Sequence, residues 1–174
     1  MSTLSDLFKN EINSKKDVTS EQKPIADNDE TSHVVGSDKK RVLFICTGNS
    51  VRSQMAEALL KSLGGDRFEV YSAGTNPAGV HHLTKQVMAE IGISMDGHYS
   101  QHISEYADTQ FDYVIPLCEV AALSCPDFPG EYERINWYID DPIRVFGDDQ
   151  RKLTAFRITR NILKKKVEDF IKSL

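Results

Sequence analysis

Apolar residues from position 40 onward fall into two patterns that recur in turn along the chain. Short continuous apolar runs bounded by turn-forming residues are typical of buried strands, whereas apolar residues spaced three and four apart are typical of helices. The runs predict strands at Val42–Cys46, Phe68–Ser72, Phe111–Leu117 and Ile135–Ile139. The spaced patterns, with their flanking Gly and Pro residues, predict helices at Ser53–Leu63, Val80–Ile91, Cys118–Ser124 and Leu153–Leu174.

Strands that alternate with helices favour one architecture. Parallel strands need crossover connections, and the helices in those connections cover the two faces of the sheet. We therefore expect residues 40–174 to form a three-layer α/β domain, a four-stranded parallel sheet with helices on both faces. Ligands of such a sheet bind where the carboxyl ends of its strands meet, so residues that follow the strands are the first candidates for chemistry.

Residues 1–39 differ from the rest in composition. Phe8 is the only aromatic residue between Ser2 and Lys39, and the segment is dense in Ser, Thr, Asp, Glu, Asn and Lys. It buries too little apolar surface to offset the entropy of ordering it, so we expect a flexible, largely disordered tail. The apolar spacing in Leu4–Ile12 leaves open one short amphipathic helix, against a tail with no specific role.

Composition and charge narrow the possible classes of protein. The 174 residues are 40% apolar and 27% charged, which is ordinary for a globular domain. No apolar run approaches the roughly 20 residues that span a bilayer, and Met1–Asn10 lacks the basic start and apolar block of a secretory signal. A formal net charge of −5 disfavours a nucleic-acid surface. We therefore expect a cytoplasmic monomer with neither nucleic-acid nor membrane partners.

The segment between the first predicted strand and the first predicted helix carries the strongest candidate chemistry. Backbone N–H groups of such a loop and of the helix that follows can converge on a tetrahedral oxyanion. Gly48 and Asn49 tolerate the left-handed backbone of a tight cradle, and Arg52 offers a planar fork for two oxyanion oxygens. Cys46 would attack as a thiolate, and Ser53 could donate a hydrogen bond to it. The expected oxyanion-binding loop is Thr47, Gly48, Asn49, Ser50, Val51 and Arg52.

Five separated segments carry a family resemblance: Val42–Glu57, Tyr71–Gly74, Phe111–Ile115, Cys118 to Gly130 and Trp137 to Pro142. In this order they resemble the thioredoxin-coupled arsenate reductases, which share their fold and loop with the low-molecular-weight tyrosine phosphatases. The resemblance covers residues 40–174 and implies a flavodoxin-like fold. It also implies roles for four residues: Cys46 as nucleophile, Arg52 as oxyanion ligand, Ser53 as thiolate stabiliser and Asp141 as general acid.

The other cysteines bear on the choice between reductase and phosphatase. Cys118 ends the third predicted strand, so a parallel sheet brings it to the same edge as Cys46, with neighbouring strands about 4.8 Å apart. The spacing between Cys118 and Cys125 is that of the second and third thiols of the reductases. Phosphatases of this fold usually have tyrosine where Ile143 stands and proline where Gln54 stands, which also favours the reductase. The alternatives are a tyrosine phosphatase and, for Cys118 and Cys125, inert core thiols.

By this resemblance the reaction is the reduction of arsenate to arsenite. Cys46 would attack the arsenic while Asp141 assists loss of hydroxide as water. Cys118 would then attack the Cys46 sulfur and release arsenite. Cys125 would take over the disulfide as a Cys118–Cys125 pair, which a reduced thioredoxin would open. No bound cofactor is expected.

Two further features concern a bound cation or metal, and a third concerns the loop itself. Some family members bind potassium near the loop through positions matching Asn49, Glu57, Ser72 and an acidic residue, but Gln101 stands at the acidic position here, so we expect no bound cation. Val51 stands where the family often has a cysteine, which leaves the mechanism untouched. A metal-binding or arsenite-sensing protein is a third alternative, but no compact Cys/His spacing supports it. We therefore expect the histidines to be exposed: His81, His82, His98 and His102.

Overall fold

The computed structural model describes residues 39–174, so the expected flexible tail, residues 1–38, lies outside the described residues. Four strands follow in chain order: β1 (Lys40–Cys46), β2 (Phe68–Gly74), β3 (Tyr113–Pro116) and β4 (Glu133–Arg134). Four helices connect and follow them: α1 (Arg52–Gly64), α2 (His82–Ala89), α3 (Glu119–Leu123) and α4 (Asp149–Ser173). Three short 3₁₀ helices complete the domain: η1 (Gly65–Arg67), η2 (Ile103–Tyr106) and η3 (Pro142–Arg144).

The strands form one parallel sheet in the order β2-β1-β3-β4, which confirms the four-stranded parallel sheet. In the register of the central strand, Val42 lies opposite Val70 on β2 and Tyr113 on β3. β1 is flanked on both sides and covered on both faces, so its residues from Val42 to Cys46 are buried. This explains its continuous apolar run.

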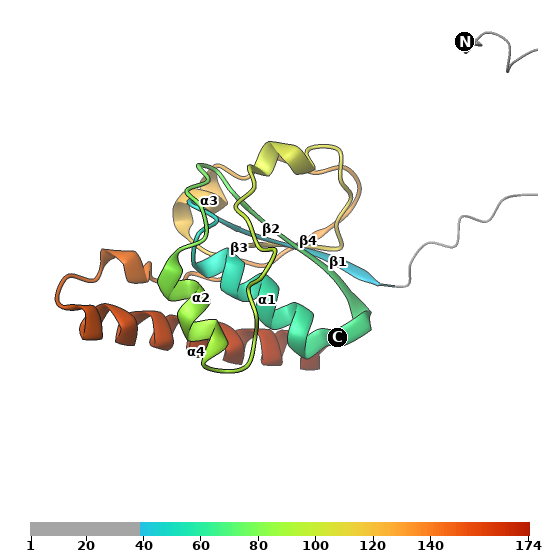
Figure 1. Cartoon of the computed structure of the whole chain (residues 1–174). Helices are drawn as coiled ribbons and strands as arrows, with labels where there is room; N and C mark the ends of the chain where they lie inside the picture. Colours follow the sequence, from blue (N-terminus) through green and yellow to red (C-terminus); the bar gives the residue numbers. More distant parts are fainter. Residues whose placement is uncertain (1–38) are drawn as a thin grey trace, which may run out of the picture. The chain divides into compact units, whose positions relative to one another are not determined.

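Successive residues of β1 face two separate apolar clusters, because side chains alternate along a strand. Phe44 packs with Met55 of α1 and Phe156 of α4 in one cluster, and Leu43 belongs to the other with Ile103 and Phe111. Helices α1, α2 and α4 thus cover one face of the sheet, and η2 and α3 lie toward the other (Figure 1). The expectation of helices on both faces is confirmed.

The last strand is shorter and earlier than Ile135–Ile139, so that prediction is wrong in its bounds. Backbone N–H groups of Ile135 and Trp137 still donate to the carbonyls of Val114 and Pro116, at 3.1 and 2.9 Å. Pro116 has no N–H with which to return a bond to Ile135, so the ladder beyond β4 is one-sided. The segment that leads to Asp141 therefore runs along the edge of the sheet without being a regular strand.

Two helices begin elsewhere than the apolar spacing predicts. Helix α2 begins at His82 rather than Val80, because the preceding backbone bonds to the first loop: the N–H of His81 donates to the carbonyl of Ser50 at 3.1 Å. Helix α4 begins four residues before Leu153, where the Asp148 carboxylate accepts from the N–H of Arg151 at 2.8 Å and caps it.

No helix within residues 39–174 is long and apolar enough to cross a membrane.

Candidate active site

The loop between β1 and α1 is a tight turn whose carbonyl groups are held from outside. The N–H groups of Asn76 and Ala78 donate to the carbonyls of Thr47 and Gly48, at 2.8 and 2.9 Å. Asn49 adopts the left-handed backbone, with φ of 44°, as its residue type led us to expect. With the carbonyls of Thr47, Gly48 and Ser50 bonded to residues 76–81, the opposite side of the loop is open to a ligand. There a cavity of about 30 Å³ is lined by Cys46, Gly48, Ser50, Val51, Arg52, Asp141 and Ile143.

Gly74, which the sequence did not single out, allows this turn. It ends β2 opposite Cys46, and a β-carbon placed on it would lie 2.7 Å from the carbonyl oxygen of Thr47 and 2.8 Å from the nitrogen of Asn49. Real β-carbons essentially never approach backbone atoms so closely. Only glycine therefore lets β2 pass beneath the loop in this arrangement.

Cys46 is buried, and its sulfur lies 3.0 Å from the hydroxyl oxygen of Ser53. That hydroxyl oxygen already accepts a hydrogen bond from the side-chain amide of Asn49 at 2.8 Å. The same amide donates to the hydroxyl of Ser72 at 2.8 Å, which fixes its orientation. Ser53 is thus left with a proton to donate toward Cys46, which is the arrangement that stabilises a thiolate.

Arg52 and Asp141 close the cavity as an ion pair. One terminal nitrogen of the Arg52 guanidinium lies 2.8 Å from a carboxylate oxygen of Asp141, and the other donates to the carbonyl of Ile139 at 2.9 Å. The second oxygen of Asp141 accepts from the N–H of Ile143 at 3.1 Å and so caps η3. Within residues 39–174 the buried Nε of Arg52 has no hydrogen-bond partner. A donor therefore remains for an oxyanion.

Cys118 lies in an adjoining pocket that shares Arg52 and Asp141 with this cavity. Its sulfur is 3.6 Å from the hydroxyl oxygen of Thr47, and it accepts from the N–H of Ala121 at 3.4 Å as the N-cap of α3. A pocket of about 410 Å³ is lined by Thr47, Arg52, Cys118, Glu119, Val120, Tyr138, Ile139, Asp140, Asp141 and Arg144. The sequence placed Cys118 at this edge, but nothing in its spacing identified the contact with Thr47.

Cys125 is separated from Cys118 by α3 and lines neither that pocket nor the cavity beside Cys46. Its thiol donates to the carbonyl of Pro126 at 3.4 Å, and burial raises its pKa, with the nearby Arg134 acting in the opposite direction. All three cysteines are free thiols. The structure thus brings Cys46, Arg52, Ser53, Asp141 and Cys118 together and leaves Cys125 beyond a helix.

The four residues at the family's potassium-ligand positions, three that match and Gln101 in place of the acidic one, also lie close together. Asn49 donates to Ser72, Ser72 donates to Glu57, and the backbone N–H of Gln101 donates to the side-chain oxygen of Asn49. The side-chain oxygen of Gln101 accepts from the hydroxyl of Tyr106 at 2.9 Å, and Lys61 pairs with Glu57. Protein groups thus already bond to oxygens of all four side chains.

The histidines have local structural roles. His82 and His102 are exposed as expected, but His81 and His98 are half-buried, so the expectation is wrong for these two. The ring of His98 bonds to the buried side chain of Gln54 at 2.9 Å.

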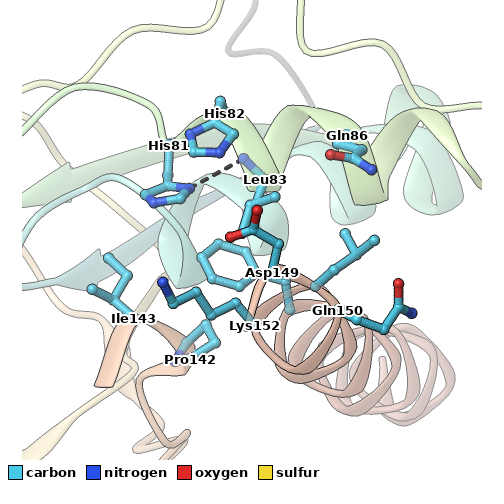
Figure 2. Close-up of a pocket in the computed structure, with 11 residues that line it drawn as sticks. His81, His82, Leu83, Gln86, Pro142, Ile143, Asp149, Gln150 and Lys152 are labelled. Carbon is cyan, nitrogen blue, oxygen red and sulfur yellow. Dashed lines mark hydrogen bonds between the residues drawn. The ribbon is translucent and has the colours of Figure 1, made fainter. Parts of the chain in front are cut away.

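His81 lines a pocket of about 510 Å³ between α2, η3 and α4, where its Nδ1 accepts from the N–H of Leu83 (Figure 2). Its ring lies against Phe156, with 4.9 Å between the ring centroids. Burial lowers the pKa of His81, which suits this acceptor role.

Comparison with known proteins finds relatives of the domain described above, from residue 41 to residue 174. Residues 41–174 match the family described as low molecular weight phosphotyrosine protein phosphatase. An arsenate reductase from Halalkalibacterium halodurans is 41% identical over 133 residues, which are 76% of this chain and 96% of that protein.

Solved structures show the same similarity. An arsenate reductase in an oxidized state has a TM-score of 0.65 at 32% identity, covering 77% of this chain and 98% of that one. A thioredoxin-dependent arsenate reductase from Corynebacterium glutamicum has a TM-score of 0.56 at 28% identity, covering 76% of this chain and 63% of that one.

Proposed function

The chain belongs to the low molecular weight phosphotyrosine protein phosphatase family, with arsenate reductases among its relatives, and from this premise we propose that it reduces arsenate to arsenite through Cys46, Cys118 and Cys125. The electrons come from a thioredoxin, as in the thioredoxin-dependent relative. The observation that carries the proposal is the position of the second thiol. The sulfur of Cys118 lies 3.6 Å from the hydroxyl oxygen of Thr47, the residue that follows Cys46 in the chain.

In the first step Cys46 attacks the arsenic of bound arsenate. The loop's inner N–H groups and the Arg52 guanidinium, including its unpartnered Nε, hold the oxyanion. The thiolate displaces one hydroxyl group of arsenate, and Asp141 passes a proton to that hydroxyl so that it leaves as water; for this the carboxyl of Asp141 exchanges its ion pair with Arg52 for the substrate. The carboxyl of Asp141 lines the same cavity as Cys46, which supports this role.

In the second step the thiolate of Cys118 attacks the Cys46 sulfur. A Cys46–Cys118 disulfide forms, and the electron pair of the broken sulfur–arsenic bond stays on arsenic, which is thereby reduced from As(V) to As(III) and leaves as arsenite. The N–H of Ala121 and the hydroxyl of Thr47 both contact the Cys118 sulfur and hold it beside the loop.

In the third step the thiolate of Cys125 attacks Cys118, forms a Cys118–Cys125 disulfide and releases Cys46. Five of the six residues between them form helix α3, which at a rise of about 1.5 Å per residue holds its two ends apart, whereas a disulfide needs α-carbons within about 7 Å. Helix α3 therefore has to unwind, and its five residues make few internal bonds that resist this. Thioredoxin then reduces the exposed disulfide.

Three further expectations belong to this proposal. The enzyme acts as a monomer, since the residues assigned to the relay all lie in one chain. It works in the cytoplasm, where thioredoxin keeps thiols reduced. Residues 40–174 form the catalytic domain.

A second activity shares the same cavity. Cys46, Arg52 and Asp141 are the groups that a phosphatase of this family would use, and none of them needs Cys118. We infer a weak hydrolysis of aryl phosphates, in which water rather than a thiol releases the intermediate.

The test is arsenate-dependent NADPH oxidation with thioredoxin and thioredoxin reductase. The wild-type protein should turn over, and Cys46→Ser should abolish both this activity and aryl phosphate hydrolysis. Cys118→Ser should stop reduction and retain hydrolysis, because only the loop performs the latter. Reduction at wild-type rate by Cys118→Ser would overturn the relay.

A further inference from the structure

Helix α3 is held more by side chains at its two ends than by its own packing. Its first turn is capped by the sulfur of Cys118, and of its five residues only Ala121 is fully buried. Val120 and Leu123 expose 53% and 81% of their surface. At the other end the guanidinium of Arg134, on β4, donates to the carbonyl of Ala122 in the last turn of α3. A side chain that satisfies a terminal carbonyl, with a positive charge at a helix C-terminus, stabilises the helix.

The backbone that carries Arg134 is fixed to the sheet by hydrogen bonds that do not involve α3. The N–H of Glu133 donates to the carbonyl of Asp112 at 2.8 Å, and the N–H of Ile135 donates to that of Val114 at 3.1 Å. These bonds fix the backbone on both sides of Arg134 to the neighbouring strand. When α3 unwinds, Arg134 therefore loses its partner in α3 but stays on the edge of the sheet.

Arg134 also acts on the third thiol. Cys125 is half-buried, and this burial raises its pKa, as does the negative charge of Asp127. Among the charged groups that act on Cys125, Arg134 is the one that lowers the pKa. The same guanidinium thus contacts the helix that has to unwind and favours the thiolate that has to attack.

We propose that Arg134 is a positioning residue of the thiol relay: it holds α3 folded in the reduced protein through Ala122, and it presents positive charge to Cys125. The proposal rests on the relay proposed above, in which Cys125 attacks Cys118. Arg134 thus acts at two stages: it stabilises α3 before the helix unwinds, and its positive charge favours the Cys125 thiolate when that sulfur attacks Cys118.

The first test is hydrogen exchange on the reduced full-length protein, without arsenate or thioredoxin. Arg134→Met should speed exchange of the Val120–Ser124 amides several-fold, while β1 stays protected. Glu133→Gln is the matched control, because its side chain lies on the same strand but points to the opposite face. Equal α3 exchange in wild type and Arg134→Met would overturn the helix-holding role.

The second test measures iodoacetamide alkylation of each cysteine against pH, resolved by mass spectrometry. In Arg134→Met the alkylation of Cys125 should shift to higher pH and slow by about two- to fivefold at pH 7.5, the range expected for an exposed charge. Cys46 should be unaffected in the same sample, and Arg134→Lys should restore the Cys125 profile because it keeps the charge. An unshifted Cys125 profile would overturn the electrostatic role. Neither test requires turnover, so failure here is distinct from failure of the relay, which Cys125→Ser reports in the thioredoxin assay.

Discussion

Replacement of Gly74 by alanine should disable the catalytic loop while leaving the domain folded. The added β-carbon would lie 2.7 Å from the carbonyl oxygen of Thr47, whereas ordinary van der Waals contact begins at 3.4 Å. Both atoms that it meets first are backbone atoms of the loop, so a rotamer change cannot relieve the clash. The loop has to move by the difference, about 0.7 Å, away from β2.

The magnitudes follow from this displacement. Overpacking of this kind costs about 1–3 kcal/mol of unfolding free energy, and the lower chain entropy of alanine in the unfolded state offsets about 0.4–1 kcal/mol. The melting temperature should therefore fall by several degrees. The catalytic loss should be larger, about 100-fold in kcat/KM, because a displacement approaching 1 Å misaligns Cys46 with the bound oxyanion.

The assay is arsenate reduction with thioredoxin, together with phosphate binding and thermal unfolding of Gly74→Ala. Gly48→Ala is the control for stability, since its β-carbon would meet nothing closer than 3.6 Å, and its melting temperature should stay near that of the wild type. Wild-type kcat/KM in Gly74→Ala would refute the argument that the loop needs this close approach.

Three further predictions concern the cation, the tail and the switch. Exchanging potassium for sodium at constant ionic strength should change activity little, because Tyr106 and Lys61 already bond to the oxygens of Gln101 and Glu57; several-fold activation by potassium would contradict this. Deleting residues 1–38 should leave activity within a few-fold and the melting temperature unchanged, and a large fall in either would show that the tail packs on the domain. Oxidation to a Cys118–Cys125 disulfide should speed amide exchange over about residues 117–128 while β1 stays protected, and unchanged exchange with a confirmed disulfide would exclude unwinding of α3.

The sequence predicts the order of the elements well because buried strands and amphipathic helices leave strong apolar patterns. It predicts the loop chemistry because Cys46 and Arg52 bracket a turn between a strand and a helix. It fails at β4, where Pro116 removes a return hydrogen bond on a different strand, and at the start of α2, where the backbone bonds to Ser50. Such effects depend on residues far apart in the chain.

Site contacts escape sequence reasoning for the same reason. The role of Gly74 depends on the path of the loop above it, and the contact between Thr47 and Cys118 joins the ends of two strands. The contact of Arg134 with the carbonyl of Ala122 has no local signature at all.

The shortness of β4 also affects how copies of the protein meet. An edge strand with free N–H and carbonyl groups is a template on which another chain can add a strand and begin to aggregate. Here the edge carries a regular strand of only two residues, Glu133 and Arg134, and both are charged and exposed. A second copy that approached this edge would find almost no ladder to extend and would have to remove water from two charged side chains. The edge of the sheet that carries Arg134 thus offers little on which another copy of the chain could add a strand.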